Sequence, residues 1–231
     1  TDAWGIDIGH WWWGTETIVR NFDSNIVEFM GKESHFMDEK TQQALKQIWD
    51  FAHTHEVMPT SQAMEGGRNK MFVAGKLAIL CNCAADVVTG MATAVGGKFP
   101  YDYTTIPQAD RGLLGTQQQA DSVNIYANTE YPKESFGLCA EITSVEASKW
   151  TALTTGMTPG ACPAAWEDPE VAAKYPWYGK EGEWFKTNVP EPPPMPYNFR
   201  FNEVGAVWNA EWNPIKDGER PFDQENLQDI N

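Results

Sequence analysis

Hydrophobic and polar residues alternate along this chain in blocks that predict a succession of short strands and helices. Residues 4–8 and 77–81 are short apolar runs, and the second, apolar throughout and bounded by Gly and Asn, predicts a buried strand. Between them, apolar residues recur at helical spacing over residues 38–56, with Asp38 placed to cap the start. The apolar stripe of this helix consists of Ala44, Leu45, Ile48, Trp49 and Ala52.

The rest of the chain continues this alternation. Further helices are predicted over residues 64–75, 84–95, 132–142, 144–155, 202–212 and 222–230, with Gly75 as a C-terminal cap and Ser144 and Asp223 as N-terminal caps. Strands are predicted over residues 25–29, 101–106 and 122–127, and the proline-rich residues 189–196 read as an extended linker. Because strands and helices alternate without internal repeats, we expect an α/β protein with a mainly parallel or mixed sheet.

The chain is strongly acidic: 32 Asp and Glu against 17 Lys and Arg give a formal net charge of −15 over 231 residues. Such a field repels polyphosphates and anionic membrane surfaces, so no nucleic-acid partner is expected. No apolar run approaches the roughly 18 residues needed to span a bilayer. No basic start followed by an apolar core is visible, so a signal peptide has been removed or the chain is a segment of a longer protein.

Tryptophan is abundant, with 11 residues, and three of them are consecutive. Indole has a flat apolar face that suits the C–H face of a sugar ring, although most tryptophans in a globular protein belong to its core. Trp11, Trp12 and Trp13 cannot all face one core, because neighbours in a strand point to opposite sides and neighbours in a helix diverge by about 100°. At least one of them is therefore expected to be exposed or to line a cavity.

No motif for catalysis, metal binding or a cofactor is present in the sequence. The chain lacks a nucleophile elbow, the HExxH zinc motif, a P-loop and a dinucleotide-binding fingerprint, so no catalytic residues and no cofactor are expected. Cys81 and Cys83 are too closely spaced for a usual zinc site, so no metal is expected either. A disulfide between Cys139 and either Cys162 or Cys81, and buried free thiols, are both compatible with the sequence.

Four stretches, in this order along the chain, resemble the C-terminal two-thirds of the family 1 extracellular solute-binding proteins of ABC importers. They are KTQQALKQIWDFAHTHEVMPT, MFVAGKLAILCN, FPYDYTTIPQ and FNEVGAVWNAEWNPIKDGERPFDQENLQDIN. Each stretch alone is degenerate, whereas the ordered set spans most of the chain and is more specific.

The resemblance implies a type II periplasmic-binding-protein-like fold of two α/β lobes, with most of the second lobe present and the first lobe incomplete. Residues 1–110 and 166–231 are expected in the second lobe, and residues 111–165 are expected to visit the first. The opening strands and helices of the first lobe should precede Thr1, so the chain is expected to be a fragment.

The same resemblance implies a function in transport. The protein is expected to be a periplasmic or extracellular monomer, with a lipid anchor as one option, that binds a sugar or oligosaccharide in the inter-lobe cleft. It would deliver this solute to the membrane subunits of an ABC importer and perform no chemistry. The alternative is a carbohydrate-active, glycoside-hydrolase-like domain with a carboxylate pair about 5–9 Å apart, although the sequence singles out no such pair. A third alternative is a structural or adhesive extracellular fragment without an aromatic-lined cleft.

Ligand contacts are assigned by the resemblance to two aromatic positions. One of Trp11, Trp12 and Trp13 is expected at the solute, with Trp12 preferred, and Trp208 is expected to stack against it. The alternative for Trp208 is a place in the hydrophobic core.

Polar contacts to the solute are expected from Asn82, Arg200 and Glu203. Asn82 ends the second apolar strand, where open α/β sheets present side chains to a crevice, unless it caps the next helix instead. Arg200 and Glu203 stand at the start of the Trp208 helix. Ala85 lies near the position where relatives carry a second stacking tryptophan, which suggests a different or smaller solute.

Overall fold

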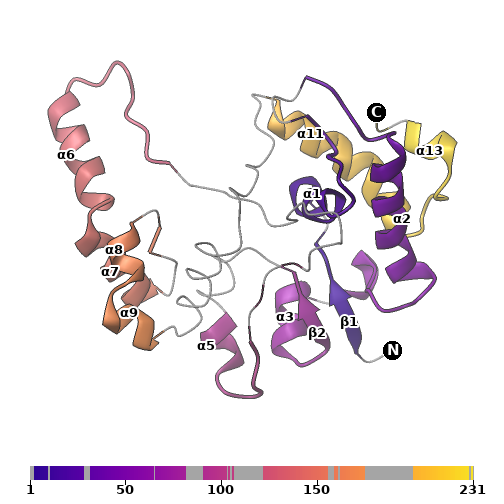
Figure 1. Ribbon diagram of the computed structural model, residues 1–231, viewed down its shortest axis with the longest axis horizontal. Coiled ribbons are helices and arrows are strands. Elements are labelled where there is room, and N and C mark those ends of the chain that lie inside the picture. Colours follow the sequence, from indigo (N-terminus) through magenta and orange to yellow (C-terminus); the bar gives the residue numbers. More distant parts are fainter. Residues whose placement is uncertain are drawn as a thin grey trace. The chain divides into compact units, whose positions relative to one another are not determined.

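The helices and strands of the chain (Figure 1) fall into two units, and each unit has its own hydrophobic cluster. The computed structural model describes residues 3–9, 11–28, 32–64, 66–81, 91–102, 104, 106, 122–155, 159–160, 162–174, 200–228 and 230. Unit 1 comprises Thr1–Asn82, Thr105–Gln118 and Glu191–Asn231, and unit 2 comprises Cys83–Thr104 and Gln119–Pro190. No helix within these described ranges combines the length and apolar character that crossing a membrane requires.

Unit 1 is built on two parallel strands, β1 (Trp4–Asp7) and β2 (Leu77–Leu80), paired in the register Trp4↔Leu77 and Asp7↔Leu80. Both strands lie where the apolar runs predict them. The expectation of a fully buried second strand is wrong, because Leu77 is buried but Ile79 is 55% exposed. The described sheet contains only these two strands, so little covers this residue.

Parallel strands require a long crossover, and here it contains the helices α1 (Trp12–Arg20), α2 (Glu39–His53) and α3 (Arg68–Val73), with the short 3₁₀ turn η1 (Ser61–Ala63). The predicted helix over 38–56 is confirmed as α2, and its stripe faces the core, with Ala44, Leu45 and Ile48 at most 1% exposed and Trp49 partly buried. Asp38 occupies the N-cap position, but its carboxylate lies 3.1 Å from His35 Nδ1 and makes no capping hydrogen bond.

Helix α1 begins inside the triple tryptophan, a stretch for which the sequence predicts no element. Its inner face buries Trp12 and Val19 together with the ion pair Glu16–Arg20. The carboxylate of Glu16 also accepts a hydrogen bond of 2.7 Å from the backbone N–H of Ile26, which fastens the following loop to the helix. The strand predicted over 25–29 reduces, in its described residues, to a single antiparallel bridge between Val27 and Ser34.

The C-terminal part of unit 1 is a helical segment followed by one short helix. It consists of α11 (Phe201–Val207), the π-helical turn η3 (Trp208–Trp212), α12 (Asn213–Lys216) and α13 (Gln224–Gln228). Pro214 has no N–H to donate to the carbonyl four residues earlier, which accounts for a wider turn just before it. Asp223 caps α13 as predicted, because its carboxylate accepts the Asn226 N–H at 3.0 Å.

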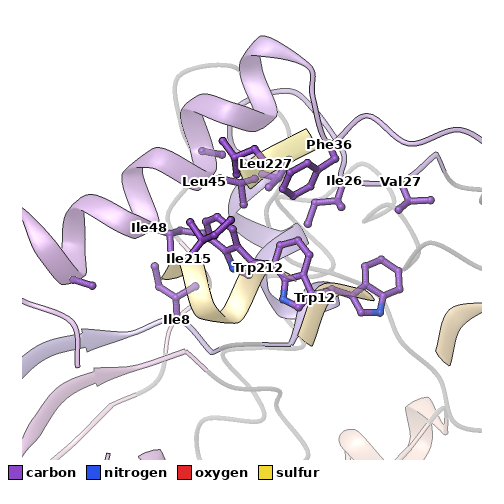
Figure 2. Packing of buried hydrophobic residues seen from close by; sticks show 14 of the residues in the cluster. Ile8, Trp12, Ile26, Val27, Phe36, Leu45, Ile48, Trp212, Ile215 and Leu227 are labelled. Atoms are coloured by element: carbon purple, nitrogen blue, oxygen red, sulfur yellow. The ribbon is translucent and has the colours of Figure 1, made fainter. Parts of the chain in front are cut away.

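The core of unit 1 lies between α1, α2 and the C-terminal helices, where side chains from distant parts of the chain converge (Figure 2). Its buried members are Ile8, Trp12, Val19, Ile26, Val27, Phe36, Ala44, Leu45, Ile48, Ala52, Met58, Trp208, Trp212, Ile215 and Leu227. Both Trp208 and Trp212 belong to it, at 2% and 0% exposure. The core of unit 1 therefore forms only when residues 8–58 pack against residues 208–227.

Unit 2 consists, in its described residues, of α5 (Ala92–Val95), α6 (Pro132–Ile142), α7 (Val145–Thr155), α8 (Pro163–Trp166) and α9 (Pro169–Lys174). The predicted helices over 132–142 and 144–155 are confirmed, and Ser144 caps the second by accepting the Ala147 N–H at 3.1 Å. The strand predicted over 122–127 is absent, and the described residues of 101–106 are in no strand. A strand needs a neighbour, and the described residues of unit 2 provide none.

The boundaries of the two units differ from those expected for the lobes. Residues 83–104 and 166–190 group with unit 2 rather than with residues 1–82. For the second segment the reason is local packing: Trp166 and Val171 join Ala152 in the small core of unit 2, and Lys149 pairs with Asp168 at 2.8 Å. The predicted linker over 189–196 and residues 84–90 of the predicted helix over 84–95 lie outside the described residues. Which unit corresponds to which lobe stays a prediction.

Candidate functional site in unit 1

The carboxyl ends of β1 and β2 are where a ligand site is expected in unit 1, since open α/β sheets bind ligands at this edge. Asp7 is the last residue of β1, and Cys81 directly follows β2. The N–H of Cys81 donates to the carbonyl of Asp7 at 2.9 Å, so the two strand ends are held side by side. Asp7 is the one charged residue in β1 and is only 2% exposed.

Arg68, the first residue of α3, links the groups at this edge. Its Nε lies 2.6 Å from Oδ2 of Asp7, and its Nη2 donates a hydrogen bond to the carbonyl of Cys81. The guanidinium carbon lies 4.6 Å from the centroid of the Trp11 ring, within the range of a cation–π interaction. Arg68 is 8% exposed, so this charged pair is largely withdrawn from water. One side chain thus fixes both strand ends and the first tryptophan.

Trp11 stands at the N-cap of α1, with an extended backbone conformation (φ −80°, ψ 146°). Its indole is half-buried and packs over Gly14, where any Cβ would overlap the ring. Gly9 has φ +87°, and a Cβ there would lie 2.7 Å from Nη1 of Arg68 and 3.1 Å from the Trp11 ring. Two glycines therefore allow the indole to lie close to the backbone at the end of β1.

The three consecutive tryptophans separate as expected from their geometry. The rings of Trp11 and Trp13 lie 4.9 Å apart at 39°, and both are half-buried. Trp12, in contrast, is 3% exposed and packs in the core, with its ring 4.9 Å from that of Phe201. The preference for Trp12 as the ligand-contacting member needs correction, because the core of unit 1 covers its ring (Figure 2). Trp11 and Trp13 remain the candidates.

Trp208 is also in the core. Its ring lies 5.4 Å from that of Trp212 and meets Phe36 edge-on at 6.2 Å. At 2% exposure it has no open face within unit 1, which corresponds to the packing alternative stated for it above. Trp12 and Trp208 are thus brought into the same core rather than to the edge of a solvent-filled groove.

The predicted polar contacts are only partly located. Arg200 and Glu203, at the start of α11, are 67% and 69% exposed and lie 3.7 Å apart as an i,i+3 pair. Both could reach a solute, and their assignment stays a prediction. Asn82 and Ala85 lie outside the described residues. Within the described ranges, His, Cys, Asp and Glu form no group of three or more that could hold a metal ion.

Sequence reasoning missed Asp7 and Arg68. A signal for Asp7 existed, since it is a carboxylate in an otherwise apolar strand ending at the ligand edge. Nothing in the sequence pointed to its partner, because Arg68 lies at the start of a helix far along the chain and only the fold brings the two together.

The thiol of Cys81 provides a direct test of this arrangement. Burial raises its pKa to about 11, and Asp7 adds to the increase while Arg68 opposes it. Because the thiolate is the reactive form, we expect Cys81 to react with Ellman's reagent at pH 7.5 at least about a hundredfold more slowly than an ordinary free thiol of pKa about 8.5. Cys81, Cys139 and Cys162 are all free, so each can be measured alone in a background that has the other three cysteines replaced by alanine. Reaction of Cys81 at the rate of the unfolded protein would contradict the geometry.

Comparison with known proteins reveals similarity in structure rather than in sequence. No protein-family model and no curated protein matches this sequence. Among solved structures, the ABC substrate-binding protein Lmo0181 from Listeria monocytogenes, in complex with cycloalternan, superposes with a TM-score of 0.74 at 13% identity over 99% of this chain and 57% of its own. Maltose-bound MalE3 of T. maritima gives 0.71 at 16% identity, over 99% of this chain and 59% of its own. UgpB from Mycobacterium tuberculosis, in complex with glycerophosphocholine, gives a TM-score of 0.72 at 12% identity, over 99% of this chain and 55% of its own.

These matches cover nearly all of this chain but only 55–59% of the solved chains. The chain therefore spans a little over half the length of the proteins it is similar to. At identities of 12–16% the likeness concerns the fold. By fold, this chain is a partial type II periplasmic-binding-protein-like structure of the kind found in MalE-like, family 1 extracellular solute-binding proteins, as its sequence resemblance implied.

Proposed function

We propose that this protein is an extracytoplasmic solute-binding protein that captures a sugar or oligosaccharide for an ABC importer and performs no chemistry itself. The observation that carries the proposal is the ring pair Trp11–Trp13, which follows the carboxyl end of β1 and is only half-buried, with Trp13 packed against the outside of the core. The fold in which the pair occurs is shared with structures solved with maltose and with cycloalternan. Lmo0181 is described as an ABC substrate-binding protein, and MalE3 and UgpB are seen with maltose and glycerophosphocholine bound, which supports binding over catalysis.

The surroundings of Trp11 suit a rigid stacking surface. The buried Arg68 lies over its ring, and Gly9 and Gly14 let the ring lie close to the backbone. Since a binding surface that is already ordered loses little conformational entropy when the ligand arrives, such pre-organisation favours affinity. The C–H face of a sugar ring would lie against the remaining indole surface, and exposed polar groups such as Arg200 and Glu203 would serve its hydroxyl groups.

The charged groups at the strand ends, Asp7 and Arg68, suit a role in holding the strand ends and the Trp11 ring in place rather than a role in catalysis. Asp7 and Arg68 are buried and paired with each other at 2.6 Å, so the carboxylate is already neutralised by a neighbour. A glycoside hydrolase needs two carboxyl groups placed on either side of the scissile bond. We therefore propose that the solute leaves the protein chemically unchanged. The protein would act as a monomeric receptor, in the periplasm or at the cell surface, and would release the solute to the transporter.

A ligand screen tests this function. We expect maltose, maltotriose or another sugar to raise the melting temperature, because a ligand at a hundred times its Kd stabilises the folded state by about 2.7 kcal/mol. Glycerophosphocholine serves as a non-sugar probe in the same panel. A stabilising effect of this compound alone would overturn the sugar assignment, and turnover of any sugar by the purified protein would overturn the assignment as a receptor.

Trp11→Ala is the site-directed test. We expect it to weaken sugar binding by about tenfold or more, since loss of an aromatic stacking surface costs on the order of 1.4 kcal/mol. Calorimetric titration of the variant measures the change, and Trp11→Phe should retain part of the affinity. Trp150→Ala is the matched control, because Trp150 is 63% exposed on α7, in unit 2. Equal affinity of Trp11→Ala and the unaltered protein would remove Trp11 from the site.

A further inference from the structure

The ion pair between Asp7 and Arg68 joins three separate segments of unit 1. Strand β1 ends at Asp7, helix α3 begins at Arg68, and Cys81 directly follows β2. Nε of Arg68 lies 2.6 Å from the Asp7 carboxylate, and Nη2 of Arg68 donates to the carbonyl of Cys81. The N–H of Cys81 in turn donates to the carbonyl of Asp7 at 2.9 Å. The contacts form a closed cycle, so the guanidinium cannot move unless at least one of them breaks.

The guanidinium fixed in this way lies over the ring of Trp11, with 4.6 Å between its carbon and the ring centroid. Trp11 follows Asp7 by only four residues, but the intervening Gly9 has φ +87°, in a region that glycine enters freely. The backbone by itself therefore restrains the indole weakly. A Cβ on Gly9 would lie 2.7 Å from Nη1 of Arg68 and 3.1 Å from the indole, so the two groups meet beside this glycine. Arg68 thus supplies a restraint on the ring that the connecting chain does not.

The two charged side chains offer almost no surface to a ligand. The side chains of Arg68 and Asp7 are 9% and 4% exposed, whereas Trp11 is half-buried. A sugar at the strand ends would therefore contact the indole and not the ion pair. Burying two charges costs solvation energy, and a well-packed apolar pair of the same volume is often equally stable. Stability alone is thus a weak reason for an ion pair at this place, and the contact with Trp11 provides a better one.

We propose that Arg68 and Asp7 are positioning residues of the sugar site: Asp7 fixes the guanidinium, and the guanidinium fixes the Trp11 ring on which the sugar stacks. The inference rests on the proposed function and adds that affinity depends on two residues that the sugar does not touch. A ring held in its binding orientation loses less conformational entropy when the ligand arrives. Arginine suits this role because its planar fork of donors can hold the Asp7 carboxylate and the Cys81 carbonyl at once.

Asp7→Asn/Arg68→Met is the central variant, because it removes both charges and leaves neither buried alone. We expect calorimetric titration with maltose or maltotriose, whichever stabilises the unaltered protein more, to give an affinity lower by about tenfold. Arg68→Lys is a milder change that keeps a charge beside Asp7 but loses the planar fork, so it should lose part of the affinity. Unaltered affinity in both variants overturns the proposal.

Lys46→Met is the matched control for this titration. Nζ of Lys46 also lies over a tryptophan ring, 4.9 Å from the centroid of Trp49, and it also pairs with a carboxylate, that of Asp50. The contact belongs to α2 and does not involve the strand ends. We therefore expect Lys46→Met to leave the affinity for the sugar unchanged. A loss as large as that of the central variant would show that the effect is not specific to Arg68, and it would overturn the proposal.

Fluorine NMR of protein labelled with fluorotryptophan tests the position of the ring without any sugar. Trp11→Phe, Trp208→Phe and Trp212→Phe assign the three signals. We expect the Trp11 signal to shift and broaden in the central variant and in Arg68→Lys, as the ring exchanges between orientations. The signals of Trp208 and Trp212, which lie in the core, should stay in place and show that the variants are folded. An unchanged Trp11 signal overturns the proposal. Failure of every sugar to bind the unaltered protein would contradict the proposed function, and the Trp11 signal would still show whether the ion pair positions the ring.

Discussion

Replacing Trp208 by alanine is expected to lower the free energy of unfolding of unit 1 by about 3–5 kcal/mol, the usual cost of removing a large buried aromatic side chain. The side chain is 2% exposed and lies between Phe36 and Trp212, so its removal leaves a cavity that these rings cannot fill without moving. Domains are stable by only about 5–15 kcal/mol, so this loss takes a large part of the total. Urea denaturation followed by near-ultraviolet circular dichroism measures it.

The same substitution separates packing from ligand contact. Trp150→Ala removes the same group from a position that is 63% exposed, and we expect a change within about 0.5 kcal/mol. If Trp208→Ala is as stable as Trp150→Ala but has lost sugar binding, Trp208 contacts the solute after all, and the core described here is wrong at that position. Trp208→Phe, which keeps an aromatic ring, should recover part of the stability.

Breaking the buried ion pair of α1 is expected to have an effect of similar size. In Arg20→Met the carboxylate of Glu16, which is 0% exposed, loses the guanidinium 3.3 Å away, and an unpaired buried charge costs about 3–5 kcal/mol. The hydrogen bond from the Ile26 N–H remains, so the loop stays attached and the charge is the main change. Thermal or urea denaturation at pH 7 measures the loss.

The pH dependence of this variant has a definite sign. Burial raises the pKa of Glu16 above its ordinary value of 4.5, and Arg20 opposes the increase. Removing Arg20 therefore raises this pKa further, so the folded variant binds a proton more readily than its unfolded chain. When the pKa of a group is higher in the folded state than in the unfolded state, the group's contribution to stability is fully present below the pKa of the unfolded chain. This contribution is lost as the pH rises through the pKa of the folded protein. The difference between Arg20→Met and the unaltered protein should thus be smaller at pH 4 than at pH 7.

A double variant provides the control for this prediction. Glu16→Gln/Arg20→Met has no buried charge at this place and keeps a group of similar shape beside Ile26. We expect it to recover much of the stability lost in Arg20→Met and to show no additional dependence on pH, because a well-packed neutral pair often replaces a buried ion pair at little cost. If the double variant is as unstable as the single one at every pH, the loss comes from packing of the Arg20 side chain and not from the charge of Glu16.

Comparison of α1 and α2 shows which elements the sequence can predict. The stripe of α2 repeats at helical spacing from Ala44 to Ala52 within a helix of 15 residues, so its position follows from the pattern alone. Helix α1 has only nine residues, starts with two tryptophans and contains Gly14, and its local sequence does not favour a helix over a strand. It forms because Trp12 and Val19 pack against residues of α2 and of the C-terminal helices, which the local pattern does not contain.

The sequence by itself determined the α/β class, the long helices, both strands of unit 1 and the separation of the three tryptophans, because each depends on spacing between near neighbours. The tertiary structure alone decided which rings are buried, that Arg68 reaches Asp7 and Trp11, and that residues 122–127 form no strand in this chain. The physical reason is that burial, ion pairing and strand formation require partners from distant segments. A local pattern shows that a residue needs such a partner, but only the folded chain shows which partner it finds.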